Sequence, residues 1–286
     1  MNNFIFSGFA DEICKDFGEQ LKNLKKLGIN TIEPRQLDGK SIIDITKEEA
    51  IKYKQMIDAE GMGVSAIGSP IGKIDITADF EEHFDKYKHV LDLADIFGTK
   101  NIRMFSFFIP EGEEPVRYRP EVMKRLRRLL DEAKKRNIVL CHENEKSIYG
   151  EKPEYCLDIL REFGGEMRAV YDMCNFIMAN AEPYPYSFNL VKDYIEYIHI
   201  KDADADHNIC PAGEGIGCVY EVMRDLSELR AGKPTYVTLE PHLKIFDGLD
   251  KLSAHEVLKR KYTYATSYEA FEAAVNAVFA INERIK

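Results

Sequence analysis

The stretch Asn137-Ile-Val-Leu-Cys-His142 decides the fold, because it is a short apolar run that stops at an acidic residue, Glu143. Such a run is typical of a strand that is buried on both faces of a parallel sheet. Three later runs have the same form and also stop at a side chain that can bind a metal. These runs are 167–171 before Asp172, 194–198 before His199, and 235–239 before Glu240. Since parallel strands end at one edge of a sheet, we expect the four side chains to lie together.

The rest of the chain alternates short apolar runs with longer stretches of helical spacing. Expected strands are 4–9, 31–32, 63–67, 100–105, 137–142, 167–171, 194–200 and 235–239, and expected helices are 17–27, 45–59, 79–97, 120–136, 155–163, 187–194, 219–229 and 267–281. Eight such units predict a (β/α)8 TIM barrel with a single domain over residues 1–286. A doubly wound open sheet would usually have fewer strands and a glycine-rich phosphate-binding turn, which Gly8-Phe-Ala-Asp-Glu12 is not.

Composition limits the partners of the protein. Its 286 residues carry a formal net charge of −10, which disfavours a surface for nucleic acid, since that requires clustered Lys and Arg. The six cysteines form no Cys-x-x-Cys pair, so neither a zinc ribbon nor a disulfide framework is indicated. With no leader-type N-terminus and no apolar stretch long enough to span a bilayer, we expect a cytoplasmic protein without membrane contact.

The four strand-end residues have the chemistry of a metal site. Three carboxylates and one imidazole suit a single divalent cation, Mn²⁺, Mg²⁺, Co²⁺ or Zn²⁺, with positions left open for substrate. Any one of these acidic residues alone is more often a helix cap or a solvated loop charge. The same position of all four in their units favours a site instead. Such a site could polarise the carbonyl of a hydroxy-ketone while two carboxylates exchange a proton, which is the chemistry of isomerisation or epimerisation.

The eight-unit pattern and these motifs resemble the xylose-isomerase-like TIM-barrel superfamily, in particular its sugar phosphate isomerase/epimerase group. The resemblance covers nearly the whole chain and rests on Glu143 in Glu-Asn, Asp172, His199 with Ile200-Lys201-Asp202, Gly213-Glu-Gly215 and Glu240. It implies that Glu143, Asp172, His199 and Glu240 bind one divalent metal and that Glu143 and Glu240 are also the catalytic acid/base pair. Dimers or tetramers are common in this superfamily, so a homo-oligomer is one option.

Five further residues are expected to contact a small, carbohydrate-like substrate: Glu33, Arg103, Asn175, Lys201 and Glu214. Glu33 at a strand end could also orient a ligand or form a cap, and Arg103 and Lys201 could bind a phosphate or carboxylate or pair with nearby acids. Asn175 departs from the family pattern, which often has His three residues after the metal-binding Asp. Glu145 likewise stands where His often follows Glu-Asn. Both departures leave the substrate open.

Three other functions compete with an isomerase or epimerase. A dehydratase of an inosose-like or dehydroshikimate-like substrate can use the same metal and base, because β-elimination also begins with loss of an α-proton. An endonuclease IV-like nuclease is disfavoured by the charge and by only seven histidines. A non-catalytic binding barrel remains open because of Asn175. The acidic segment Asp202-Ala-Asp-Ala-Asp-His207 is expected to be a solvated loop, and segments 105–115, 176–186 and 241–265 are candidate lids.

Overall fold

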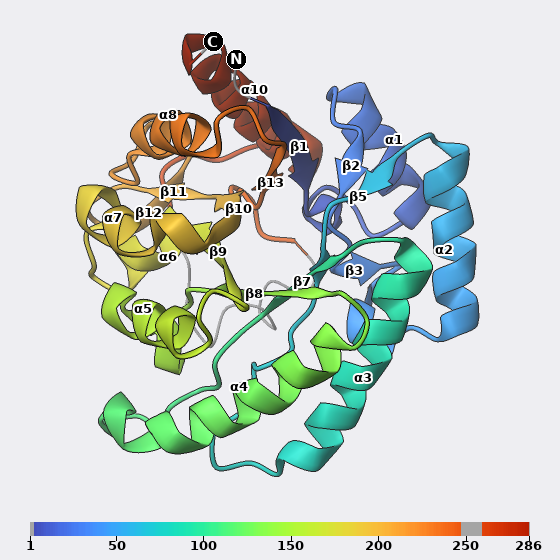
Figure 1. Cartoon of the computed structure of the whole chain (residues 1–286). Coiled ribbons are helices and arrows are strands. Elements are labelled where there is room, and N and C mark those ends of the chain that lie inside the picture. The colour runs from blue at the N-terminus through green and yellow to red at the C-terminus, as the bar shows by residue number, and fades with distance from the viewer. Residues whose placement is uncertain (1–2, 247–258, 286) are drawn as a thin grey trace.

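Seven parallel strands form the main sheet and curl around a common centre in the computed structural model (Figure 1). The structure describes residues 3–246 and 259–285. The strand order is β1-β13-β10-β9-β8-β7-β6. Their bounds are β1 Phe4–Gly8, β6 Ile67–Gly68, β7 Asn101–Met104, β8 Val139–Glu143, β9 Arg168–Asp172, β10 Ile195–Ile200 and β13 Thr235–Leu239. The predicted TIM barrel is confirmed.

The strands expected at 31–32 and 63–67 do not form part of a regular eight-stranded sheet. β2 (Thr31–Ile32) pairs in parallel with β5 (Gly63–Val64), and the expected strand 63–67 is divided into β5 and β6. Between β1 and this pair of strands, hydrogen bonds from side chains take the place of some backbone hydrogen bonds. The Thr31 hydroxyl donates to the Phe6 carbonyl at 2.6 Å, and the hydroxyls of Ser7 and Ser65 are 2.8 Å apart. The wall is therefore continued beyond β1 by β2 and β5, although these two strands lie outside the seven-stranded ladder.

Helices surround the strands (Figure 1). Their bounds are α1 Phe17–Lys26, α2 Lys47–Ala59, α3 Phe80–Phe97, α4 Arg119–Lys134, α5 Pro153–Glu162, α6 Met173–Met178, α7 Phe188–Val191, α8 Val219–Arg230 and α10 Ser267–Ile285. Local signals explain their limits. Asp16 and Thr46 cap α1 and α2 by accepting hydrogen bonds from backbone N–H groups, and Gly98 ends α3 in the left-handed conformation. Each of the longer helices has buried apolar side chains, such as Leu21 of α1, Ile57 of α2 and Val90 of α3.

The region after β9 differs from the expected single helix over 187–194. α6 begins directly after Asp172, and α7 is only four residues long. Short helical turns occupy the other connections: η1 Ala10–Glu12, η2 Ile42–Asp44, η3 Pro115–Tyr118, η4 Tyr149–Glu151, the π-type η5 Pro183–Ser187, and η6 Lys192–Tyr194. Two small sheets lie apart from the barrel wall. They are formed by β3 Gln36–Leu37 with β4 Lys40–Ser41, and by β11 Asp202–Ala203, β12 Asn208–Cys210 and β14 Lys259–Arg260.

The expectation of a solvated acidic loop at 202–207 is wrong for Asp202, whereas Ala205 and Asp206 are exposed. Asp202 is 1% exposed, and its carboxylate accepts hydrogen bonds from the backbone N–H groups of Ala203, Gly213, Gly215 and Gly217. A Cβ atom at Gly215 would lie 2.3 Å from its Oδ1 atom. Three glycines thus let the backbone wrap a buried carboxylate, which fixes the loop after β10.

Three other expectations concern disulfides, membrane spans and lids. All six cysteines are free thiols. Across residues 3–246 and 259–285, no helix has the length and apolar character needed to cross a membrane. Residues 247–258 of the candidate lid 241–265, which include His255, lie outside the described residues.

We predict that His83 makes the protein sensitive to acid. Its ring is 8% exposed, its Nε2 atom accepts a hydrogen bond from Gly72 N at 2.8 Å, and burial, with the nearby charges of Lys86 and Arg125, lowers its pKa to about 4. The unfolded chain, with a histidine pKa of about 6.5, takes up a proton first as the pH falls. The contribution of neutral His83 to the free energy of unfolding is therefore fully present above pH 6.5. As the pH falls from 6.5 toward 4, this free energy decreases by about 1–3 kcal/mol.

Denaturant unfolding at pH 7.5 and pH 4.5 measures this loss. We expect His83→Gln, whose side-chain oxygen can accept the Gly72 hydrogen bond, to lose less stability between the two pH values than the wild type. His89→Gln is the matched control, since His89 is a partly buried histidine of the same helix. Equal losses in the two variants would contradict the prediction.

Candidate metal centre

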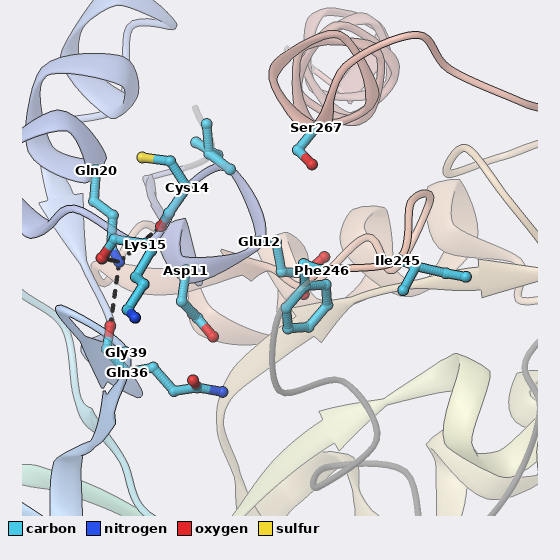
Figure 2. Close-up of a pocket in the computed structure, with 11 residues that line it drawn as sticks. Asp11, Glu12, Cys14, Lys15, Gln20, Gln36, Gly39, Ile245, Phe246 and Ser267 are labelled. Atoms are coloured by element: carbon cyan, nitrogen blue, oxygen red, sulfur yellow. Dashed lines mark hydrogen bonds between the residues drawn. The ribbon is translucent and has the colours of Figure 1, made fainter.

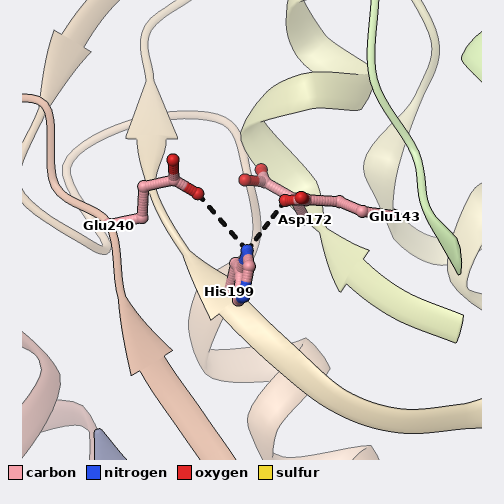
Figure 3. A group of neighbouring side chains, drawn as sticks. All are labelled: Glu143, Asp172, His199 and Glu240. Atoms are coloured by element: carbon pink, nitrogen blue, oxygen red, sulfur yellow. Dashed lines mark hydrogen bonds and ion pairs between the residues drawn. The ribbon is translucent and has the colours of Figure 1, made fainter. Parts of the chain in front are cut away.

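The structure brings the four predicted ligands together at the carboxyl ends of their strands (Figure 3). Glu143 and Asp172 are the last residues of β8 and β9, His199 lies in β10, and Glu240 directly follows β13. Their side chains are buried, and one candidate donor atom from each lies within 4.8 Å of the others. Parallel register produces this meeting, because His199 is paired with Asp172 on one side and with Thr238 on the other. That they bind a metal remains a prediction.

His199 stands between the two glutamates. Its Nδ1 atom is 2.8 Å from Glu143 Oε1 and 3.3 Å from Glu240 Oε2 (Figure 3). Burial lowers the pKa of His199, but the charges of Glu143 and Glu33 outweigh burial and raise the pKa well above its ordinary value. Carboxylates that stabilise an imidazolium this strongly would also stabilise a metal cation at the same place.

Glu33 lies behind His199 rather than in the open part of the site. One carboxylate oxygen is 3.2 Å from His199 Nε2 and accepts a hydrogen bond from the Thr238 hydroxyl at 2.8 Å, and the other accepts one from the Tyr197 hydroxyl at 3.0 Å. Glu33 itself is 0% exposed. With both oxygens engaged, it fits the role of orienting His199 better than the predicted contact with substrate.

Arg103 and Lys201 are the two cations beside the four predicted ligands. Arg103 Nη1 is 3.1 Å from Glu143 Oε2, and Lys201 Nζ is 3.2 Å from Asp172 Oδ2. Both side chains are almost fully buried. Burial raises the pKa of Asp172, with Lys201 opposing and Glu143 adding to the rise. These ion pairs offset part of the negative charge of the four predicted ligands.

Asn175 and Asn144 join two of the ligand loops. Asn175 N donates to Asp172 Oδ1 at 2.9 Å, so Asp172 caps α6 as well as facing the other ligands. The Asn175 side chain donates to the Asn144 carbonyl at 2.9 Å, and the Asn144 amide forms two hydrogen bonds with the Asp172 backbone. Asn144 belongs to the Glu-Asn motif quoted above, but no role was predicted for it from the sequence. Its position directly after Glu143 was the available signal.

Glu214 has other partners than the predicted ligands. Its carboxylate is exposed, accepts a hydrogen bond from the Tyr262 hydroxyl at 2.6 Å and lies 3.5 Å from Lys261 Nζ. Its predicted contact with substrate stays a prediction.

A second group of side chains adjoins Glu240 and was not predicted. Arg35 Nη1 donates to Glu240 Oε1 at 2.8 Å, and His242 Nε2 lies 3.3 Å from the same oxygen. Asp11 and Glu12 complete the group by binding the Arg35 guanidinium. Burial raises the pKa of Glu12 to about 8, with Arg35 opposing the rise. The sequence signal was weak, since Asp11 and Glu12 lie in the three-residue turn η1, and Arg35 and His242 lie in loops.

A pocket of about 210 Å³ opens beside this second group (Figure 2). Figure 2 shows Asp11 and Glu12 on its wall together with Phe246 and Ile245. Cys14, Lys15, Gln20 and Gln36 line it as well.

The donor set fits a hard divalent cation. Three carboxylates and one imidazole supply oxygen and nitrogen ligands without a thiol. Asp172 Oδ2 is buried and accepts no hydrogen bond within residues 3–246 and 259–285, where its recorded contact is the ion pair with Lys201. An oxygen that is left without a hydrogen bond in a buried site is suited to coordinate an ion. Glu143, Asp172, His199 and Glu240 are therefore the residues that could hold one.

Fold and site together define a TIM barrel with a candidate metal centre at the carboxyl ends of four adjacent strands of the main sheet. The family model for xylose isomerase-like TIM barrels matches residues 21–257. The chain belongs to this family.

Solved structures show the same fold at low sequence identity. A probable 3-DHS dehydratase, AsbF, from Bacillus anthracis is 16% identical with a TM-score of 0.72, covering 98% of this chain and 99% of the other. D-allulose 3-epimerase from Methylomonas sp., in complex with D-allulose, is 14% identical with a TM-score of 0.71, covering 99% and 98%. A Mycobacterium smegmatis protein of the family, in complex with magnesium, is 16% identical with a TM-score of 0.67, covering 98% of each chain. A comparison with curated proteins found no significant match.

Proposed function

We propose that this protein is a metal-dependent isomerase or epimerase of a sugar, a sugar phosphate or a related hydroxy-ketone. The observation that carries the proposal is the placement of Glu143 and Glu240 on two sides of His199, with candidate donor atoms of all four predicted ligands within 4.8 Å of one another. Two carboxylates that face a common point can remove a proton from one side of a carbon and return one to it.

The residues around the two glutamates support proton transfer. Glu143 is held through Oε2 by Arg103, and Glu240 is held through Oε1 by Arg35. In each glutamate the other oxygen faces His199 and the common centre. When bound, a divalent cation would polarise the substrate carbonyl and stabilise negative charge that develops on its oxygen. Lys201, beside Asp172, adds a further positive charge to the site.

The comparisons support sugar chemistry as a class. Relatives in fold include the D-allulose 3-epimerase named above and an L-ribulose 3-epimerase, which is 17% identical with a TM-score of 0.72. The magnesium in the M. smegmatis relative supports a divalent ion. A small carbohydrate-like substrate is accordingly part of the proposal.

A dehydratase is the second candidate, and the pair Arg103 and Lys201 favours it. Two buried cations beside the predicted ligands could bind the carboxylate of a dehydroshikimate-like ring. The probable 3-DHS dehydratase is among the similar structures. Removal of the α-proton would then be followed by loss of a hydroxyl group instead of return of a proton.

Mass analysis in D2O separates these functions. We expect the protein with added Mn²⁺ to incorporate one solvent deuterium into a ketose without loss of mass as water. Loss of water from a dehydroshikimate-like or inosose-like compound would replace the first proposal by the second. A broad panel of ketoses and cyclic ketones should be tested. If Mn²⁺ binds but no compound of the panel exchanges a proton or loses water, both proposed functions are contradicted.

A further inference from the structure

Arg35 is buried between the barrel wall and the loop that follows β1. It lies three residues after β2, and only 3% of it is exposed. Its guanidinium carbon is 4.1 Å from the centre of the Phe9 ring and 5.4 Å from that of Phe246. Arginine keeps its charge at any ordinary pH, so this is a permanent cation in a nearly dry environment.

The two oxygens of Glu240 have different partners. Oε1 accepts a hydrogen bond from Arg35 Nη1 at 2.8 Å, and Oε2 is 3.3 Å from His199 Nδ1. One oxygen is thus held away from the other predicted ligands and the second is directed toward them. A carboxylate held in this way has lost its rotational freedom before a ligand arrives, which favours binding and proton transfer.

Arg35 is itself held in place. Its Nε atom donates to Asp11 Oδ2 at 3.0 Å, and its Nη2 atom is 3.4 Å from Glu12 Oε1. Each edge of the planar guanidinium therefore has an acidic partner, a geometry that lysine cannot reproduce. The role of the Asp11 contact is to fix the angle at which Arg35 meets Glu240.

Glu33 and Arg35 act on two different predicted ligands from one short segment. Glu33 contacts His199 Nε2, while Arg35 contacts Glu240. The segment is fastened to its neighbours, since Glu33 N donates to the Gly8 carbonyl and Gly68 N donates to the Pro34 carbonyl. Both side chains thus reach predicted ligands from the short connection between β2 and β3.

We propose that Arg35 is a positioning residue that sets which oxygen of Glu240 faces the metal and substrate. The proposal rests on the function proposed above. Arg35 does not touch the reacting atoms, and its effect passes through Glu240. Removing it should weaken metal binding by about ten- to one hundred-fold, the range that is usual for outer-shell partners of a metal ligand.

The experiment compares Arg35→Gln and Arg35→Lys with a matched control, Arg125→Gln. Arg125 is also a buried arginine that lies over two phenylalanines, Phe80 and Phe107, but its partners are Glu121 and the Ala78 carbonyl. Calorimetric titration with Mn²⁺ gives the Kd, and deuterium exchange gives kcat and KM. We expect Arg35→Gln to lose affinity and kcat, Arg35→Lys to recover part of both, and Arg125→Gln to keep wild-type values. Equal Mn²⁺ affinity and kcat in Arg35→Gln and Arg125→Gln would overturn the proposal.

Asp11→Asn provides a second test should Arg35→Gln fail to fold. It weakens a contact of the guanidinium and leaves the hydrogen bond to Glu240 in place. We expect an Mn²⁺ affinity between those of the wild type and Arg35→Lys, and a wild-type affinity would overturn the positioning role. A wild-type protein that binds Mn²⁺ but exchanges no proton contradicts the proposed function alone, because the Mn²⁺ affinities of the variants still test Arg35.

Discussion

Glu143→Gln and Glu240→Gln are each expected to lower kcat for exchange of the substrate proton with solvent by about 10²- to 10⁴-fold, the usual contribution of a positioned acid or base. The amide keeps the shape of each side chain and can still accept the hydrogen bond from Arg103 or Arg35. It cannot take up a proton at neutral pH. The double variant should be little worse than either single variant, because two groups that act as one unit are not additive.

Deuterium incorporation at saturating Mn²⁺ measures these losses, so that weaker metal binding does not count as lost proton transfer. Glu196→Gln is the matched control, since Glu196 lies in β10, three residues before His199, and pairs with Arg168 at 3.3 Å. We expect it to keep wild-type kcat. A kcat within a few fold of wild type in either active-site variant would remove that glutamate from the proposed acid/base pair.

His199→Ala is expected to abolish binding of a divalent ion at micromolar concentration. It removes the only nitrogen donor of the predicted ligands, and it removes one partner from each of two buried carboxylates, Glu33 and Glu143. Loss of one partner from a buried ion pair typically costs about 3–5 kcal/mol of folding stability. The effect on affinity should exceed the hundredfold that is typical of outer-shell partners.

Thermal unfolding with and without Mn²⁺ tests this prediction together with calorimetry. An ion at one hundred times its Kd stabilises the native state by about 2.7 kcal/mol, which raises the Tm of the wild type. We expect no such rise in His199→Ala and a full rise in the control His89→Ala, a histidine that contacts the Ile45 carbonyl far from the site in sequence. An Mn²⁺-dependent rise in Tm that survives in His199→Ala would show that the ion binds elsewhere.

Local patterns were sufficient for most of the fold. Strands β8 and β9 end at Glu143 and Asp172, where the apolar runs stop, and the glycine after Phe97 ends α3 as expected. The errors fall where elements are too short to show a period. The strand expected at 63–67 is instead two strands of two residues each, β5 and β6. Helix α6 has six residues, fewer than two helical turns.

The candidate centre was partly accessible from sequence for a related reason. Its four predicted ligands all follow apolar runs, and the ends of parallel strands share one edge whatever the details of packing. Asp202 shows the limit of that argument. Its acidic surroundings suggested solvent, whereas three glycines well beyond it in the chain supply the backbone N–H groups that bury it.

By itself, the sequence determined the barrel and the membership of Glu143, Asp172, His199 and Glu240 in one group, because these depend on short-range periodicity and on strand direction. Only the tertiary structure decided which oxygen of Glu240 is directed inward and what holds it. Arg35 and Glu240 are 205 residues apart, and His242 and Glu12 are 230 apart. Such contacts depend on the paths of loops across the barrel, for which no local pattern exists.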